Sequence, residues 1–195
     1  MIRIAITGGI ACGKSLVGEI FSDLDVPVCD ADYLAHSLML PGKGVYDKVV
    51  EKFGKSIIAP NGNIDRKKLG EIVFADEQLR LALNKIVHPA VKDLLEDWLC
   101  KHNEFRAAAV IIPLLYVAKM ENGWDAVICV SCSDEVQLKR LIGRGLSDRE
   151  ARQRISAQLP TVEKMSHADY VIFNDGTVLM LKKQVEKVLR HVLEK

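Results

Sequence analysis

A glycine-rich stretch near the amino end of the chain carries the clearest chemical pattern. Residues 8–15 read GGIACGKS and fit the pattern G-x-x-x-x-G-K-[ST]. In such a loop the glycines let successive backbone N–H groups point at phosphate oxygens, and the following helix adds free N–H groups with partial positive charge. Lys14 can reach the β- and γ-phosphates, and the Ser15 hydroxyl can ligate Mg²⁺. The pattern predicts a nucleoside triphosphate site, although a glycine-rich turn with a solvated Lys14 would match the same letters.

The segments on either side of this loop have the periodicity that it requires. Residues 2–7 form a β-branched run that predicts a buried strand, and residues 14–24 have the apolar spacing of an amphipathic helix. Further apolar runs predict strands over residues 26–30, 107–113, 126–131 and 169–173. Apolar strands separated by helical segments are typical of a parallel sheet covered on both faces. We therefore expect an α/β fold with five parallel strands.

The interval between the second and third expected strands is long and mostly helical in pattern. Asp65 is a candidate N-cap for a helix that begins at Arg66, and a longer helix is expected over residues 76–101. Pro89 falls inside that longer helix, where it is expected to bend or split it. We interpret residues 33–106 as a helical insertion within a single unit that spans the whole chain of 195 residues.

Two carboxylates, Asp30 and Asp32, follow the second expected strand. Ligands of open α/β sheets bind at the carboxyl ends of the strands, and strand spacing would turn one of the two toward such a cleft. A carboxylate there can accept or orient the proton of an attacking hydroxyl group. A helix-capping role explains the same two residues equally well.

A basic segment later in the chain has the pattern of a lid. Arg140 and Arg144 are four residues apart and are expected on one helical face, while Ser147 and Glu150 fit a capping box for the next helix. Arginines that close over a nucleotide stabilise the charge of the transferred phosphoryl group. A solvated basic face is the alternative interpretation.

Composition narrows the classes of function. The 27 basic and 26 acidic residues nearly balance, which indicates no general attraction to nucleic acid or to an anionic membrane. No apolar run approaches the length of a membrane span, and five scattered cysteines are typical of reduced thiols in the cytoplasm. The sequence NKIV at residues 84–87 lacks the aspartate of a guanine-specificity element, which disfavours a Ras-like switch. A small cytoplasmic phosphotransferase, with no nucleic-acid or membrane partner, is favoured.

Two cysteine patterns stand apart from this scheme. Cys129 and Cys132 form a C-x-x-C pair without a second pair or a histidine at zinc-site spacing. We therefore expect them to be buried thiols at the end of a strand rather than metal ligands. Cys12 lies at the mouth of the loop, at the start of a helix, where the pKa of a thiol is lowered. We hypothesise that its oxidation or alkylation blocks ATP.

Several motifs together resemble the dephospho-CoA kinase family. Beside the glycine-rich loop they are DAD at residues 30–32, HP at 88–89, PLL at 113–115 and ADYVIFN at 168–174. The resemblance implies a three-layer P-loop NTPase fold, in which the insertion binds the acceptor and residues 139–160 form the lid. It also implies that ATP phosphorylates the ribose 3′-hydroxyl of dephospho-CoA, giving CoA and ADP in the last step of coenzyme A biosynthesis.

The resemblance further implies roles for individual residues. Asp32, Lys14 and Arg140 would act in catalysis, and Ser15 would be the Mg²⁺ ligand. The ATP-binding set would be Ala11, Cys12, Gly13, Lys14, Ser15, Leu16, Arg144 and Asn174. The acceptor would contact Thr7, Asp32, Arg66 and His88.

This chain departs from the family pattern at the loop, where Ala11 stands in place of the usual glycine and Cys12 in place of a common serine. The phosphates are bound by backbone N–H groups, so neither change removes a required group. Another small-molecule or nucleotide kinase of the same fold is the alternative, and a non-catalytic nucleotide-binding switch is a second one. A monomer or weak homo-oligomer is expected.

Overall fold

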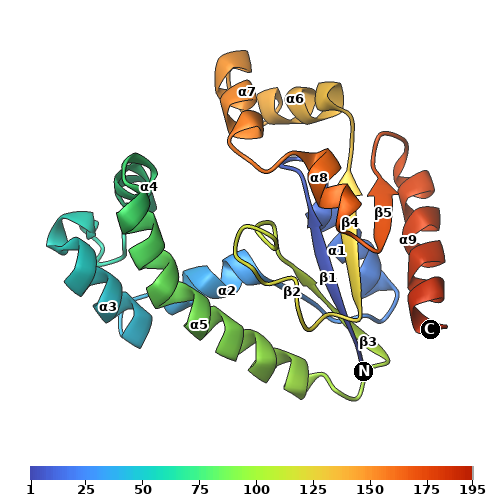
Figure 1. The fold of residues 1–195 in the computed structure, drawn as a ribbon, viewed down its shortest axis with the longest axis horizontal. Coiled ribbons are helices and arrows are strands. Elements are labelled where there is room, and N and C mark those ends of the chain that lie inside the picture. Colours follow the sequence, from blue (N-terminus) through green and yellow to red (C-terminus); the bar gives the residue numbers. More distant parts are fainter. Residues whose placement is uncertain (195) are drawn as a thin grey trace. The chain divides into compact units, whose positions relative to one another are not determined.

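The computed structural model describes residues 1–194, except for the side chain of Phe74. It divides into two compact units, and Figure 1 labels their elements. The first unit comprises Met1–Asp30 together with the chain from Lys101 onward, and the second comprises Ala31–Cys100. None of the helices described is long and apolar enough to cross a membrane.

A five-stranded parallel sheet forms the centre of the first unit. Its strands are β1 (Ile2–Gly8), β2 (Val28–Asp30), β3 (Ala107–Ile111), β4 (Ala126–Ser131) and β5 (Tyr170–Phe173). They lie in the order β2-β3-β1-β4-β5, and every neighbouring pair is parallel. The expected fold class is confirmed, and the central strand β1 places the glycine-rich loop at the carboxyl edge of the sheet.

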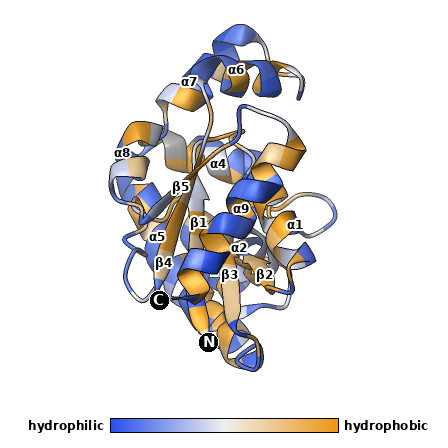
Figure 2. Ribbon diagram, turned by 90° about the vertical axis from the view of Figure 1, so that its right-hand side faces the viewer, coloured by the Kyte–Doolittle hydropathy of each residue, from blue (hydrophilic) through white to orange (hydrophobic). Residues whose placement is uncertain are grey.

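Helices cover both faces of this sheet. Helices α1 (Lys14–Asp23) and α9 (Val178–Leu193) lie on one side of the strands, and the short helix α8 (Thr161–Ser166) lies on the other (Figure 2). The core between the strands and the α1–α9 layer includes Ile4, Phe21 and Val185, all with no exposed surface. Burying a large apolar side chain stabilises the fold by about 1.5–3 kcal/mol. This layer therefore fixes α1, and with it the end of the loop.

Between β4 and α8 the chain forms two further helices, α6 (Asp134–Ile142) and α7 (Asp148–Ser156). They pack on each other through Leu141 and Ala151, and the same small apolar cluster contains Ala11 of the loop. Most of residues 139–160, for which a lid role stays a prediction, lie in this region, and its first helix packs directly on the loop.

The second unit is helical. It contains α2 (Ala31–Leu38), α3 (Gly44–Phe53), the short 3-10 helix η1 (Lys55–Ile57), α4 (Arg66–Ala75) and α5 (Glu77–Lys101), the last residue of which belongs to the first unit. The predicted cap is confirmed, because the Asp65 carboxylate accepts hydrogen bonds from the backbone N–H groups of Lys67 and Lys68 at 3.0 and 3.1 Å.

Helix α5 runs through Pro89 without a break. Of the two effects expected of this proline, a split is therefore wrong, and a bend stays a prediction. Proline removes one hydrogen bond from a helix, but the rest of the ladder remains. Buried Val87, Val91 and Leu95 recur at helical spacing on both sides of the proline, so one continuous apolar stripe keeps the two halves together.

Candidate nucleotide-binding site

The glycine-rich loop connects β1 to α1 in two left-handed steps. Gly13 is the N-cap of α1, with φ 97° and ψ 29°, and a side chain there would collide with the amide group of Asn174. Ala11 also has a left-handed backbone, with φ 58°. This conformation costs a residue with a side chain about 1–2 kcal/mol and costs glycine little. The structure thus explains why a glycine suits position 11, and shows that this chain carries the strain of an alanine there.

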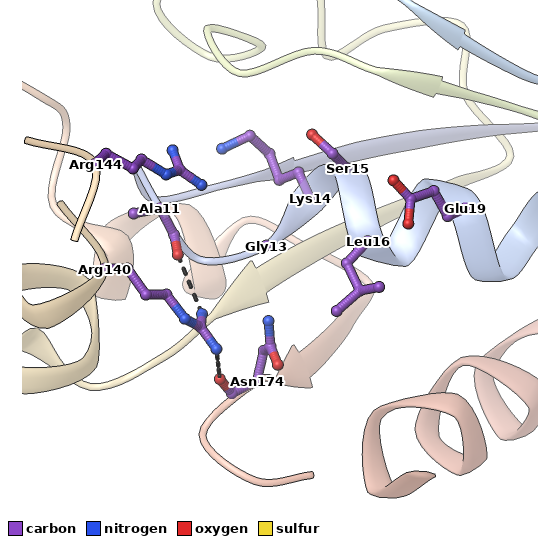
Figure 3. A pocket seen from close by; sticks show the side chains of 9 residues that line it. All are labelled: Ala11, Gly13, Lys14, Ser15, Leu16, Glu19, Arg140, Arg144 and Asn174. Carbon is purple, nitrogen blue, oxygen red and sulfur yellow. Dashed lines mark hydrogen bonds between the residues drawn. The ribbon is translucent and has the colours of Figure 1, made fainter. Parts of the chain in front are cut away.

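A cavity of about 400 Å³ opens at the N-terminus of α1 (Figure 3). It is lined by Ala11, Gly13, Lys14, Ser15, Leu16, Glu19, Arg140, Arg144 and Asn174. All of these except Glu19 are residues that the sequence singles out for ATP binding or catalysis. The fold therefore brings most of the expected ATP site into one cavity, within a single compact unit.

Three cationic side chains line this cavity. Lys14 Nζ donates to the carbonyl oxygens of Gly8 and Gly9 at 3.2 and 2.8 Å, and Figure 3 shows Lys14 and Arg144 reaching toward each other on the same side of the loop. Arg140 lies on the other side of Gly13 (Figure 3). Together with the N-terminus of α1 these charges favour an anion with several phosphate groups.

Arg140 also ties three segments together. Its guanidinium donates to the carbonyl oxygens of Ala11 at 3.1 Å and Asn174 at 2.9 Å. The Asn174 side chain in turn donates to the carbonyl oxygen of Cys12 at 2.8 Å. The guanidinium is thereby held at the edge of the cavity by the loop and by the end of β5.

The expectation that Arg140 and Arg144 share a helical face is wrong. Helix α6 ends at Ile142, and Arg144 lies in the turn that follows. The capping box predicted for the next helix is confirmed: the Glu150 carboxylate accepts from the Ser147 backbone N–H at 2.9 Å, and the Ser147 hydroxyl accepts from the Glu150 backbone N–H at 3.3 Å. Both arginines nevertheless line the same cavity, because the turn after α6 places Arg144 beside it.

Three polar side chains contact the loop without lining the cavity, and we call Gln137, Gln158 and Lys164 the loop brace. Gln137 and Lys164 are buried, and Gln158 is half-buried. Gln137 donates to the Ile10 carbonyl at 2.9 Å, and Gln158 accepts from the Ile10 backbone N–H at 3.1 Å. Lys164 Nζ donates to the Gly8 carbonyl at 3.2 Å and to the Gln158 side chain at 3.3 Å. Sequence reasoning missed these three residues.

Burial lowers the pKa of Lys164, the most enclosed cation of the site. Within the described chain its ammonium group has hydrogen-bond acceptors but no ion pair with a carboxylate. A buried charge without a counter-ion lowers stability unless its hydrogen bonds and a nearby ligand compensate. Its hydrogen bond to the Gly8 carbonyl places a further positive charge close to the loop, beside the three cations that line the cavity.

Thr7 and Cys12 lie near the cavity but do not line it. Thr7 Oγ1 is buried in β1 and has no hydrogen-bond partner among the described residues. Cys12 has no exposed surface, and the expected lowering of its thiol pKa is confirmed. Its contribution to ATP binding would come from its backbone alone.

The remaining expected residues belong to the second unit. Asp32 is exposed in the first turn of α2, so it does not follow the strand spacing assumed from the sequence, since β2 ends at Asp30. Arg66 lines a cavity of about 410 Å³ together with His36 and Asn63. The roles of these residues in acceptor binding and catalysis remain predictions.

His88 is half-buried on α5, and burial lowers its pKa. It is therefore neutral at neutral pH and would contact an acceptor as a hydrogen-bonding group rather than as a charge.

The cavity offers a hard oxygen ligand for Mg²⁺. The exposed Ser15 lines it next to Lys14, at the start of α1. Among the described residues no group of three or more His, Cys, Asp or Glu side chains could hold a metal ion by itself. Mg²⁺ in phosphoryl-transfer sites takes only one or two protein oxygens and completes its shell with phosphates and water. The donors present fit such a site.

Comparison with known proteins agrees with this geometry. The family model for dephospho-CoA kinase matches residues 2–179. A Bacillus cereus dephospho-CoA kinase is 43% identical over 194 residues, covering 97% of this chain and 96% of the relative. A crystal structure from Thermus thermophilus has a TM-score of 0.88 at 31% identity, covering 97% of this chain and 96% of that one. A dephospho-CoA kinase from Campylobacter jejuni has a TM-score of 0.70 at 27% identity, covering 98% and 97%.

Proposed function

This chain belongs to the dephospho-CoA kinase family, and from that membership together with the site we propose how it transfers a phosphoryl group. The fold is that of the P-loop kinases, and the enzyme is a transferase that uses ATP. We propose that the acceptor is the ribose 3′-hydroxyl of dephospho-CoA and that the products are CoA and ADP. The observation that carries the proposal is the cavity at the N-terminus of α1, lined by three cations and the curled loop.

The loop and its cations would bind the triphosphate. Backbone N–H groups of residues 11–16 would hold the β- and γ-phosphates, and Lys14 would leave the Gly8 and Gly9 carbonyls to contact them. Arg140 and Arg144 would stabilise the charge that develops on the transferred group. Asn174, buried beside Gly13, would lie by the adenine.

Ser15 would hold Mg²⁺ through its hydroxyl. When bound, the ion neutralises phosphate charge. The residues of this chain would orient the triphosphate by backbone and side-chain donors, and this positioning accounts for most of the catalysis in phosphoryl transfer.

Asp32 would be the catalytic carboxylate. It would accept or orient the proton of the acceptor hydroxyl, since a carboxylate at neutral pH is a hydrogen-bond acceptor. The cavity lined by Arg66 supports an acceptor-binding role for the second unit, because a guanidinium suits the anionic groups of dephospho-CoA. We further propose that the enzyme is cytoplasmic and acts as a monomer or weak homo-oligomer.

An ADP-release assay with different acceptors tests the reaction. ADP release should depend on dephospho-CoA and should not be supported by nucleoside monophosphates or by shikimate. Strong release with one of those acceptors would favour another kinase of the same fold. Tight ATP binding without release under any acceptor would favour a nucleotide-binding switch.

The Asp32→Asn variant tests the catalytic carboxylate. We expect kcat to fall by about 10²-fold or more while the Kd for ATP is retained, because the amide cannot accept the proton. Asp47→Asn, at another exposed acidic position of the second unit, is the matched control. A near-normal kcat in Asp32→Asn would remove this residue from the mechanism.

A further inference from the structure

Two cysteines that are 120 residues apart in the chain meet beneath the phosphate loop. The Cys132 thiol donates to Cys12 Sγ, with the two sulfurs 3.5 Å apart. Cys12 belongs to the loop, and Cys132 follows the last residue of β4. Both are buried, with 0% and 7% of their surface exposed. The C-x-x-C spacing would instead have paired Cys132 with Cys129.

The surroundings favour a thiolate on Cys12. The hydrogen bond from Cys132 is the largest cause, and with a second one from Gln137 Nε2 at 3.1 Å and the charge of Lys14 it lowers the pKa of Cys12 from 9.0 to about 6. The pKa of Cys132 is raised, mainly by the same hydrogen bond. Burial raises the pKa of Cys29 and Cys129 to about 11. Because the thiolate is the reactive form, Cys12 is set apart from those two buried thiols.

We propose that Cys12 and Cys132 are a site of oxidative modification, at which a peroxide converts the two thiols to a disulfide that weakens ATP binding. The Cys12 thiolate attacks one peroxide oxygen, the O–O bond breaks, and Cys12 becomes a sulfenic acid with hydroxide as the leaving group. The Cys132 sulfur then attacks Cys12 Sγ, the S–O bond breaks, and water leaves with the thiol proton. In total two thiols and one hydrogen peroxide give one disulfide and two water molecules.

The disulfide changes the loop because the sulfurs must come closer. A disulfide bond is about 2.05 Å long, so the gap has to shrink by about 1.5 Å from the observed 3.5 Å. The loop has little free space in which to absorb this movement, since even a methyl group at Gly9 would come within 2.8 Å of Cys12 Sγ. Cys12 moves together with its carbonyl, which accepts from Asn174, and with its neighbours Ala11 and Gly13 in the cavity wall.

This inference rests on the proposed role of the loop in ATP binding, and it adds that oxidation of the two thiols regulates this binding. Displaced backbone N–H groups no longer match the phosphate oxygens, so the oxidised protein binds ATP more weakly. Linkage is reciprocal, and ATP bound to the reduced protein therefore opposes formation of the disulfide.

Peroxide treatment followed by ATP-binding measurements tests the proposal on the full-length protein. We expect the Kd for ATP to rise by at least about 10-fold, within the usual range of couplings between sites, and dithiothreitol to restore it. Cys132→Ala should keep the activity of the reduced enzyme and lose the response to peroxide. Cys129→Ala, three residues earlier in β4, is the matched control and should respond like the wild type. A response that persists in Cys132→Ala would overturn the proposal.

Mass spectrometry of the Cys129→Ala protein locates the bond without relying on the Cys132 variant. Trypsin releases residues 4–14, with Cys12, and residues 120–139, which in this variant keep Cys132 alone. The two peptides should be joined after peroxide treatment with the loss of two hydrogens. Failure to find the two peptides joined would contradict the proposal. So would a joined pair in protein whose Kd for ATP is unchanged. Reduced enzyme that fails to phosphorylate dephospho-CoA would instead count against the proposed function, since the crosslink and the ATP Kd are measured without an acceptor.

Discussion

The phosphate loop has two sides that differ in almost every physical property. The cavity side carries Ser15 and Arg144, both exposed to solvent, and the partly exposed Lys14. The side of the loop brace carries Gln137 and Lys164, each with only 2% of its surface exposed. Both sides hydrogen-bond the same short loop. Charge that must meet a ligand is kept hydrated, whereas the groups that hydrogen-bond the loop from the other side are largely buried.

Because of this difference, substitutions on the two sides should affect different properties of the protein. Removing an exposed cation leaves few buried groups unsatisfied, so folding is preserved and ligand binding is lost. Removing a buried donor leaves acceptors without partners in the interior, so the free energy of unfolding falls first.

The largest effect is expected for Lys14→Met on the cavity side. Loss of the cation at the phosphates should lower kcat/KM by about 10²–10³-fold, the magnitude typical of a preorganised electrostatic group. The melting temperature should stay close to that of the wild type, because Lys14 is not enclosed. Steady-state ADP release and thermal unfolding measure the two quantities.

Lys139→Met is the matched control for this variant, because Lys139 is exposed on the neighbouring helix α6 and does not line the cavity. Its activity should be close to normal. A large loss of stability in Lys14→Met would show that the cavity side also holds the loop, and would break the distinction.

Lys164→Met should show the opposite profile. The Gly8 carbonyl and the Gln158 side chain would each lose one donor but keep another, Lys14 Nζ for Gly8 and the Ile10 N–H for Gln158. Each lost hydrogen bond costs about 0.5–1.5 kcal/mol of unfolding free energy. The KM for ATP should rise by about 10-fold while kcat changes less, because a distorted loop weakens binding of the ground state and of the transition state by similar amounts.

Denaturant unfolding and steady-state kinetics measure this prediction, and Lys187→Met on the exposed face of α9 controls for the removal of a lysine charge. Unchanged stability together with an unchanged KM would mean that the buried ammonium contributes nothing to the loop.

Cys12, which accepts a hydrogen bond from Gln137 of the loop brace, should also titrate near pH 6. Because the pKa of Cys12 falls to about 6 in the folded protein, its thiolate contributes stability above the unfolded pKa near 9 and loses it as pH falls toward 6. The raised pKa of Cys132 acts in the opposite direction above pH 9, where the unfolded thiol ionises and the folded one does not. Stability should therefore rise between pH 6 and pH 9.

Ultraviolet thiolate absorbance and unfolding at a series of pH values measure this titration. Cys132→Ala should move the transition upward toward the ordinary thiol range, since it removes the largest cause of the shift. Cys129→Ala should leave the transition in place. A transition that is identical in Cys132→Ala and the wild type would show that the second thiol does not stabilise the thiolate.

The sequence predicts the cavity side far better than the brace side, and the reason is physical. The residues of the cavity side are largely consecutive, because a strand end, a loop and a helix N-terminus are one local structure. The brace residues come from three segments more than 120 positions further along the chain. Only the three-dimensional packing brings them to the loop, and no local spacing encodes that contact.

A weak signal for the brace does exist in the sequence. Gln137 precedes Leu141 by one helical turn, and both are buried on the same face of α6. A polar side chain on an apolar helical face needs a hydrogen-bond partner, which here is the Ile10 carbonyl. Arg144 and Asp32 differ from expectation for another reason. Helical spacing does not place Arg144 because α6 ends at Ile142, and strand spacing does not place Asp32 because β2 ends at Asp30.

The smallest effect is expected at Ala11, which belongs to both sides. Ala11→Gly relieves a left-handed conformation with φ 58°, a gain of about 1–2 kcal/mol. It also gives up a buried methyl worth about 0.8 kcal/mol and adds about 0.5–1 kcal/mol of backbone entropy to the unfolded chain. These terms nearly cancel, so the free energy of unfolding should change by less than about 1 kcal/mol.

Ala151→Gly isolates the strain, because Ala151 lies in the same apolar cluster but inside the regular helix α7. It loses the same methyl and pays the same entropy without any relief, so it should lower stability by about 1.3–1.8 kcal/mol. The difference between the two variants in denaturant unfolding therefore measures the cost of holding an alanine at the bend of the loop. Equal losses would show that the bend carries no strain, and that the loop tolerates an alanine at this position without cost.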